Sequence, residues 1–228
     1  MYRDSARGAH ANRAFLRRAV AYLAQAGVDQ FLDIGSGLPT VGNIHTLAQA
    51  MNPLARVVYV DNDPVAVRYS RQLLDREKTP HTVAIEADLR DPATILGHPT
   101  TRRLLDLRRP AGLLLVAVLH FVLDDDEARH AVRAFREALA PGSYLVLSHG
   151  TLDGLPADVI ARFEAIYHRS SAPTIARSRA QIAALFGGLD IVEPGIVPTP
   201  LWHPDATRDP LADQPVRAGI LAGVGRKP

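Results

Sequence analysis

A carboxylate and two glycines lie close together near residue 35 and could form part of a ligand-binding turn. The stretch FLDIGSGLPT, residues 31–40, places Asp33 two residues before Gly35, and Gly37 follows two residues later. Glycines between a strand and a helix let the backbone approach a ligand without a Cβ atom in the way. The unpaired N–H groups at the start of the following helix favour polar or charged ligand groups. The spacing is therefore typical of a nucleotide-binding turn.

A second carboxylate follows at the end of the next apolar stretch, where ARVVYV runs into Asp61. In many strand–helix–strand units an acidic residue at this point accepts hydrogen bonds from two ribose hydroxyls. The turn and Asp61 together fit both NAD and S-adenosylmethionine.

Two residues favour S-adenosylmethionine over NAD. The dinucleotide pattern G-x-G-x-x-G requires glycine at position 40, where this chain has Thr40. The carboxylate of Asp33 would lie badly beside a pyrophosphate, whereas it suits a ligand that carries an ammonium and a sulfonium group. Further along, EADLRDP supplies Asp88 as an acceptor for an adenine amino group, with Leu89 beside the ring.

The elements that position these residues alternate between strand and helix patterns, which predicts a parallel α/β sheet. Strands are expected at 30–34, 55–60, 81–87, 111–120, 143–149, 189–193 and 217–225. Helices are expected at 10–26, 40–51, 64–76, 125–139, 156–169 and 177–187. Asp63, Asp91 and Asp124 are predicted to cap helix N-termini, the first two with a proline directly behind them.

The composition excludes several classes of protein. The chain has 228 residues, a net charge of +2 and no cysteine, so a disulfide framework, a cysteine zinc site and a thiol nucleophile are excluded. No apolar run approaches the roughly 18 residues of a membrane span, and we expect a cytoplasmic protein without a membrane partner. The arginine pairs at 102–103 and 108–109 are interpreted as a solvated face rather than a nucleic-acid patch. The acidic run 124–126 is interpreted as the opening of a helix, so no metal is expected.

Several stretches, in this order and spacing, resemble those of class I S-adenosylmethionine-dependent methyltransferases. They are FLDIGSGLPTVGN, VVYVDNDPVAV, EADLRDP and AVLHFV, and the further stretches ANRAFLRRAV and SHG narrow the resemblance to the actinobacterial S-adenosyl methyltransferase family formerly called DUF574. The resemblance covers nearly the whole chain. It implies one Rossmann-like domain over 1–228, with a seven-stranded, mostly parallel sheet whose last strand is antiparallel. It also implies S-adenosylmethionine as cofactor and S-adenosylhomocysteine as product.

The resemblance further implies that Asp33 and the two glycines hold the methionine end of the cofactor, Asp61 the ribose and Asp88 the adenine. Asn62 is either a further adenine contact or a turn residue. The candidate cofactor-binding residues are Asp33, Gly35, Gly37, Asp61, Asn62, Asp88, Leu89 and Leu119.

The methyl acceptor is expected at the carboxyl end of the strand 111–120, because ligands of parallel sheets lie outside that edge. His120 is the leading candidate for a base or a substrate contact, and His149 is the second; either could instead be a packing residue. The segments 150–187 and 194–216 are expected to cover the acceptor. Tyr167, His168, Trp202 and His203 lie in these segments and are individually better explained as packing or surface residues.

The predicted function is methyl transfer to a small-molecule acceptor by in-line displacement, with no nucleic-acid partner. A homo-oligomer is left open. One alternative is a non-catalytic cofactor-binding or interaction protein. Members of the family usually carry an N-terminal segment that covers the cofactor, whereas this sequence starts just before the helix 10–26. An NAD-dependent oxidoreductase is the less favoured alternative.

Overall fold

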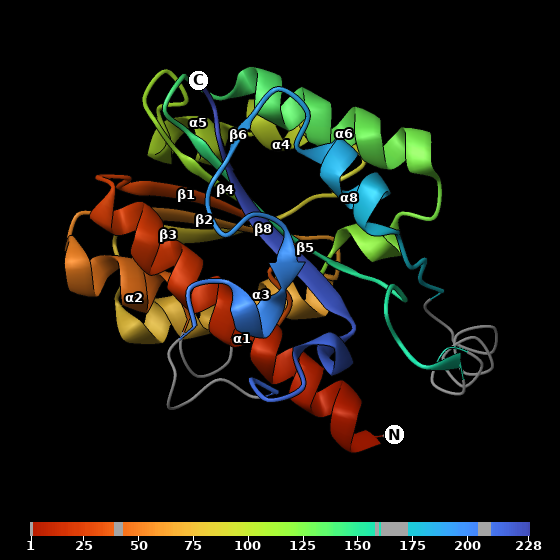
Figure 1. Ribbon diagram of the computed structural model, residues 1–228. Helices are drawn as coiled ribbons and strands as arrows, with labels where there is room; N and C mark the ends of the chain where they lie inside the picture. The colour runs from red at the N-terminus through yellow and green to blue at the C-terminus, as the bar shows by residue number, and fades with distance from the viewer. Residues whose placement is uncertain (1, 39–42, 158–159, 161–172, 205–210) are drawn as a thin grey trace.

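A single eight-stranded sheet lies at the centre of the computed structural model, which describes residues 2–38, 43–157, 160, 173–204 and 211–228 (Figure 1). Its strands are β1 (Gln30–Ile34), β2 (Arg56–Asp61), β3 (Thr82–Glu86), β4 (Gly112–Val116), β5 (Tyr144–Gly150), β6 (Asp190–Ile191), β7 (Val197–Pro198) and β8 (Ile220–Arg226). The order is β3-β2-β1-β4-β5-β8-β6, and β7 also pairs with β8. The strands β1 to β5 run parallel, whereas β8 is antiparallel to β5. The predicted mostly parallel sheet with an antiparallel last strand is confirmed.

The sheet has one strand more than the seven expected, because the chain between 189 and 198 forms two short strands instead of one. β6 covers only two residues of the predicted strand 189–193, and β7 arises from the proline-rich stretch that follows. Pro194 has no N–H group to donate to a ladder. The N–H of Gly195 closes a turn by donating to the carbonyl of Val192 at 2.9 Å. The turn separates the two strands.

Helices cover both faces of the sheet (Figure 1). They are α1 (Tyr2–Gln25), α2 (Ile44–Met51), α3 (Pro64–Glu77), α4 (Pro92–Gly97), α5 (Pro99–Leu104), α6 (Asp125–Ala138) and α8 (Arg179–Leu185), with the 3₁₀ turns η1 (Leu119–Phe121), η2 (Thr199–Leu201) and η3 (Pro215–Ala218). Successive residues of β4 alternate between two cores: Leu113 and Leu115 pack on the α6 side and Leu114 on the α1 side. Burial on both faces explains why the strand sequences read as continuous apolar runs.

The predicted helix caps are confirmed. Asp63 accepts a hydrogen bond from the N–H of Val65 at 2.8 Å, and Asp124 accepts one from Glu127 at 2.8 Å. Asp91 accepts from the N–H of Thr94 at 3.0 Å. These caps fix the starts of α3, α6 and α4.

Several predicted boundaries were wrong or cannot be compared. The helix expected from residue 10 begins at Tyr2, and the last predicted helix, 177–187, is the shorter α8, which begins after the capping box of Ser178. The helix expected at 156–169 falls largely outside the described residues, as does the beginning of the one expected at 40–51. The strand expected at 111–120 ends at Val116.

Candidate functional site

The turn after β1 folds over the carboxyl end of β2. The N–H groups of Gly35 and Ser36 donate to the carbonyl of Val60 at 2.8 and 3.1 Å. Gly37 N–H donates to Oδ2 of Asp61 at 2.7 Å. Both glycines have positive φ angles, 74° and 63°, which favour glycine. The structure thus brings Asp33, the two glycines and Asp61 together, as the sequence predicted.

Gly35 is needed for close packing within the protein as well as for its backbone angle. A Cβ atom at this position would lie 2.2 Å from Cγ2 of Val118, on the segment that follows β4. At Gly37 a Cβ atom would meet nothing within 4 Å. The turn after β1 therefore touches the segment that carries His120.

We expect Gly35→Ala to lower the free energy of unfolding by about 2 kcal/mol, because it adds both a left-handed penalty and an overlap with Val118. Urea denaturation checks this value. Gly97→Ala is the matched control, because Gly97 has no positive φ and open space around its Cβ position. The double variant Gly35→Ala, Val118→Ala should recover part of the loss, and no recovery would contradict the packing explanation.

Asp33 is a buried carboxyl group, 5% exposed, at the end of β1. Burial, together with the nearby charge of Asp61, raises its pKa from 3.8 to about 7, while Arg13 of α1 acts in the opposite direction. A carboxylate held in such a place is destabilised until a cation pairs with it. The ammonium and sulfonium groups of S-adenosylmethionine would supply that charge, so the residue fits the cofactor.

Asp61 is partly exposed and holds two backbone groups. Its Oδ2 accepts from Gly37, and its Oδ1 accepts from the N–H of Asp63 at 2.9 Å. An ionised carboxylate has about four acceptor positions, so two remain for ribose hydroxyls as far as the described residues go. The same side chain can therefore order the turn and bind a ribose.

Asp88 and Asn62 lie together, but Asp88 also forms an ion pair with Arg90, a residue with no role assigned from the sequence. Arg90 Nε donates to both carboxylate oxygens of Asp88 at 3.0 Å, and the backbone N–H of Arg90 donates to Oδ1 at 2.9 Å. These bonds, first of all the one from the Arg90 side chain, with a smaller contribution from Asn62, hold the pKa of Asp88 below its usual range. Leu89 is partly buried against the α6-side core. The adenine contact of Asp88 stays a prediction, and Arg90 shares its carboxylate.

The chain leaves the sheet after β4 through a left-handed residue, Ala117, whose φ is 56°. Its N–H donates to Oγ of Ser148 at 3.0 Å, and this hydroxyl donates to Oδ1 of the buried Asn12 at 2.6 Å. A non-glycine residue in this conformation is strained, and such strain is concentrated at functional sites. These three residues have no role assigned from the sequence, although Asn12 and Ser148 lie in the stretches ANRAFLRRAV and SHG.

Leu119 and His120 lie in η1. Leu119 is fully buried in the α6-side core and offers no side-chain surface to a ligand, so its predicted cofactor contact is not supported. His120 is partly buried, and its Nδ1 is enclosed without a hydrogen-bond partner among the described residues. Burial, and then the nearby His149 and Arg177, lowers the pKa of His120 to about 4. The imidazole is therefore neutral at pH 7, and no described carboxylate orients it as a base.

His149, at the end of β5, is completely buried. Its Nδ1 lies 2.8 Å from the carbonyl of Gly150, and its Nε2 lies 2.7 Å from Nη1 of Arg177. Burial is the main reason that the pKa of His149 is lowered to about 4. With both nitrogens engaged inside the protein, the geometry favours a structural role over the predicted catalytic one.

A cavity of about 220 Å³ lies beyond the carboxyl end of β5. Its lining is Thr151, Asp153, Gly154, Arg179, Pro198, Val216, Ile220 and Leu221. Both segments expected to cover the acceptor contribute to this wall. Of the aromatic residues in these segments, Tyr167 and His168 lie outside the described residues. Trp202 is a packing residue, fully buried and stacked on His203 at 4.3 Å.

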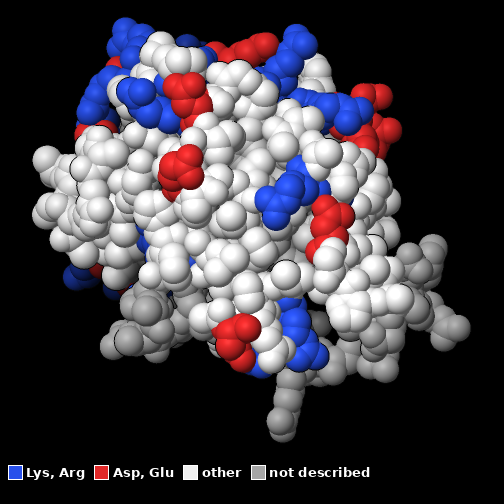
Figure 2. All heavy atoms as spheres, in the orientation of Figure 1, with Lys and Arg blue, Asp and Glu red and all other residues white. Residues whose placement is uncertain are grey.

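Some of the charged residues at the surface form ion pairs. Arg108 pairs with Asp106 at 2.9 Å and Arg109 with Asp29 at 2.8 Å. Figure 2 shows positive and negative side chains intermixed along the edge where α5 and α6 lie. Within the described part of the chain, no three His, Cys, Asp or Glu residues are grouped as a metal would require, and no helix is long and apolar enough to cross a membrane.

The sequence as a whole matches a known protein family. A family model described as S-adenosyl methyltransferase matches residues 1–228. The chain belongs to this family. Its cofactor is therefore S-adenosylmethionine, and the NAD alternative has no support. No curated protein matches the chain.

Solved structures agree with the S-adenosyl methyltransferase family. A candidate methyltransferase from Thermobifida fusca YX shares 46% identity at a TM-score of 0.87, covering 96% of this chain and 81% of its own. A DUF574 family protein from Streptomyces avermitilis MA-4680 shares 44% identity at a TM-score of 0.86, covering 96% and 83%. The N-methyltransferase NodS from Bradyrhizobium japonicum WM9, solved with S-adenosylhomocysteine, shares 17% identity at a TM-score of 0.55, covering 93% and 85%, and supports the fold alone. The fold is that of Rossmann-like class I methyltransferases.

Proposed function

We propose that this protein transfers a methyl group from S-adenosylmethionine to a small-molecule acceptor by in-line displacement. The observation that carries the proposal is the pair of carboxyl groups, Asp33 and Asp61, at neighbouring strand ends beneath a glycine turn. Asp33 is buried, and its pKa stays raised despite Arg13. Of the residues that the structure describes, Gly37 and Asp63 donate to Asp61, which has further acceptor positions. When bound, S-adenosylmethionine supplies a methyl group on a sulfonium, and the sulfur leaves neutral with the electron pair of the broken bond.

Because the leaving group is neutral, the chain has no developing oxyanion to stabilise, and alignment of the reactants supplies most of the rate. On the acceptor side, His120 is neutral at pH 7 and serves as a hydrogen-bonding contact rather than as a strong base. The cavity beyond β5 lies at the same end of the parallel strands, but neither His120 nor a candidate cofactor-binding residue lines it, so we propose it only as the place for the part of the acceptor that extends beyond His120. Its lining combines aliphatic side chains with Thr151, Asp153 and Arg179, which favours an acceptor with an apolar body and polar groups.

We expect Asp61→Ala to weaken binding of S-adenosylhomocysteine by about a hundredfold or more, because two charge-assisted hydrogen bonds to the ribose are lost. Isothermal titration calorimetry gives the Kd. Asp106→Ala is the control, because Asp106 precedes β4 at the opposite edge of the sheet. Equal affinity of wild type and Asp61→Ala would contradict the assigned ribose contact.

The acceptor class is tested with S-adenosylmethionine labelled on its methyl group. The protein is incubated with fractionated extract of its source organism, and the label is followed into small molecules, nucleic acid and protein. Transfer into the small-molecule fraction supports the proposal. Transfer only into macromolecules would overturn the acceptor class, and cofactor binding without any transfer would favour the non-catalytic alternative.

A further inference from the structure

Arg177 is a buried cation between the acceptor side of the sheet and α6. Its side chain is 2% exposed. Nε donates to Oδ1 of Asp125 at 2.8 Å, and Nη1 donates to the carbonyl of Leu119 at 2.9 Å. Nη2 donates to the carbonyl of Val122 at 2.9 Å. Nη2 also donates to the carbonyl of Asp124 at 3.5 Å. A buried charge is costly unless it is paired and hydrogen-bonded, and here one carboxylate and three carbonyls compensate it.

The same arginine reaches the end of β5. Nη1 also lies 2.7 Å from Nε2 of His149. A guanidinium has no acceptor, so Nε2 of His149 must accept this bond, and the ring proton must lie on Nδ1. That proton is donated to the carbonyl of Gly150. Arg177 therefore selects one tautomer of His149.

The backbone around Arg177 is attached to the same two elements. The N–H of Arg177 donates to the carbonyl of Gly150 at 3.0 Å. The N–H of Ile175 donates to the carbonyl of His120 at 2.9 Å. Gln181 of α8 donates to the other oxygen of Asp125 at 2.9 Å, which orients the carboxylate towards the guanidinium. The segment before α8 thus joins η1, the start of α6 and the end of β5.

We propose that Arg177 is a positioning residue, which fixes η1, and with it His120, against the end of β5. The assignment rests on the proposed function, because that function places the acceptor at the carboxyl ends of β4 and β5. One guanidinium joins three elements with five hydrogen bonds. A lysine cannot replace it, because an ammonium lacks the planar fork.

Charge also links Arg177 to the two imidazoles. The titratable groups that act on His120 are His149 and Arg177, and those that act on His149 are Arg177 and Asp125. The positive charge of Arg177 lowers the pKa of both rings, whereas Asp125 raises that of His149. Burial is the larger cause of both low pKa values, so removing the charge of Arg177 should raise them only in part.

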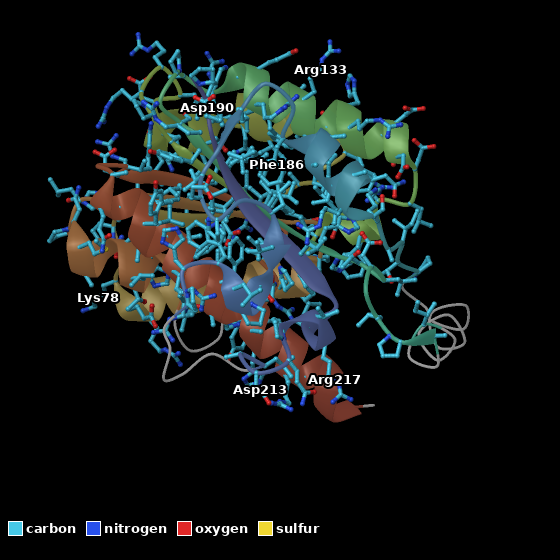
Figure 3. The ribbon with its side chains drawn as sticks, in the orientation of Figure 1. Lys78, Arg133, Phe186, Asp190, Asp213 and Arg217 are labelled. Carbon is cyan, nitrogen blue, oxygen red and sulfur yellow. The ribbon has the colours of Figure 1, made fainter. Side chains whose placement is uncertain are left out.

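The test compares Arg177→Met with Arg133→Met in the full-length protein. Arg133 lies on α6, away from the sheet, and pairs with the exposed Glu137 (Figure 3). Three quantities are measured: the ¹⁵N shifts of the imidazoles between pH 5 and 8, hydrogen exchange of the amides in 119–122, and the Kd for S-adenosylhomocysteine. All three are independent of the unknown acceptor.

For Arg177→Met we expect His149 to show a mixture of tautomers, because the donor that holds Nε2 as an acceptor is lost. The amides of Phe121 and Val122 should exchange about tenfold faster or more, because bonds to a charged donor are lost. Arg133→Met should match the wild type. Arg177→Lys should keep the low imidazole pKa values but not the slow amide exchange.

A wild-type tautomer of His149 and wild-type amide exchange in 119–122 in Arg177→Met, whatever its stability, would overturn the proposal. If Arg177→Met does not fold, Arg177→Lys decides, and unchanged exchange in 119–122 would then overturn it. Failure of the proposed function gives a different result: the wild-type protein would transfer no methyl group to any acceptor fraction, while its histidine spectra would still report the network.

Discussion

Replacing Asp33 with Asn should raise the unfolding temperature of the ligand-free protein at pH 8 and abolish its stabilisation by S-adenosylmethionine. The pKa of Asp33 is about 7 in the folded protein, against an ordinary 3.8. The folded state therefore binds more protons than the unfolded state between these values, and stability falls as the pH rises from about 4 to 7. The difference of about three pKa units corresponds to roughly 4 kcal/mol at pH 8. Asn is never charged, so it avoids this cost.

Thermal unfolding at pH 5 and pH 8, with and without S-adenosylmethionine, checks the prediction. The advantage of Asp33→Asn should be smaller at pH 5, where the wild-type carboxyl group is largely protonated in the folded protein. Asp29→Asn is the control, because Asp29 precedes β1 at the other edge of the sheet and pairs with Arg109. If Asp33→Asn lowered the unfolding temperature at pH 8, or kept the ligand-induced shift, the assigned role would be wrong.

Trp202→Ala should lower the free energy of unfolding by about 3–5 kcal/mol. The indole is 0% exposed, and its ring meets Phe15 edge-on at 5.4 Å and Tyr22 at 5.8 Å. The backbone carbonyl of Trp202 also accepts a hydrogen bond from Nε of Arg18, on α1, at 2.8 Å. Trp202 thus packs the segment before β8 against α1. Truncating its side chain to a methyl group would leave a cavity between the two elements.

Urea denaturation measures this loss, with Leu201→Ala as the neighbouring control. Leu201 is 39% exposed, so its truncation should cost much less. Trp202→Phe should lie between the two, since it keeps part of the ring packing. A loss below about 1.5 kcal/mol for Trp202→Ala would contradict the packing role.

Local signals predicted the parts of the fold that depend on neighbouring residues. Asp63 before Pro64, and Asp124 before Glu127, satisfy orphan N–H groups within three residues of themselves, and both caps are present. The apolar run of β4 predicted a strand buried on both faces. The carboxylates Asp33 and Asp61 were found because strand ends of a parallel sheet meet at one edge.

The remaining parts depend on contacts between distant residues. The run GLLLVAVLH contains no proline or second glycine to stop a strand. It leaves the sheet at Ala117, where a hydroxyl of β5 and Asn12 of α1 hold the turn, and Asn12 lies 136 residues from Ser148. Arg177 contacts residues more than 50 positions before it, and IARSRAQ carries no local sign of this. The full burial of Leu119 likewise follows from the strand ending early.

The contact between Gly35 and Val118 means that the cofactor turn and the segment on the acceptor side pack directly against each other. The turn that would hold the cofactor and the segment that leads into η1 meet with no room for a single added methyl group. A ligand that shifts one surface must therefore shift the other. Such coupling is reciprocal by thermodynamic linkage, so an acceptor that displaces Val118 alters the affinity for the cofactor by the same factor as the cofactor alters the affinity for the acceptor.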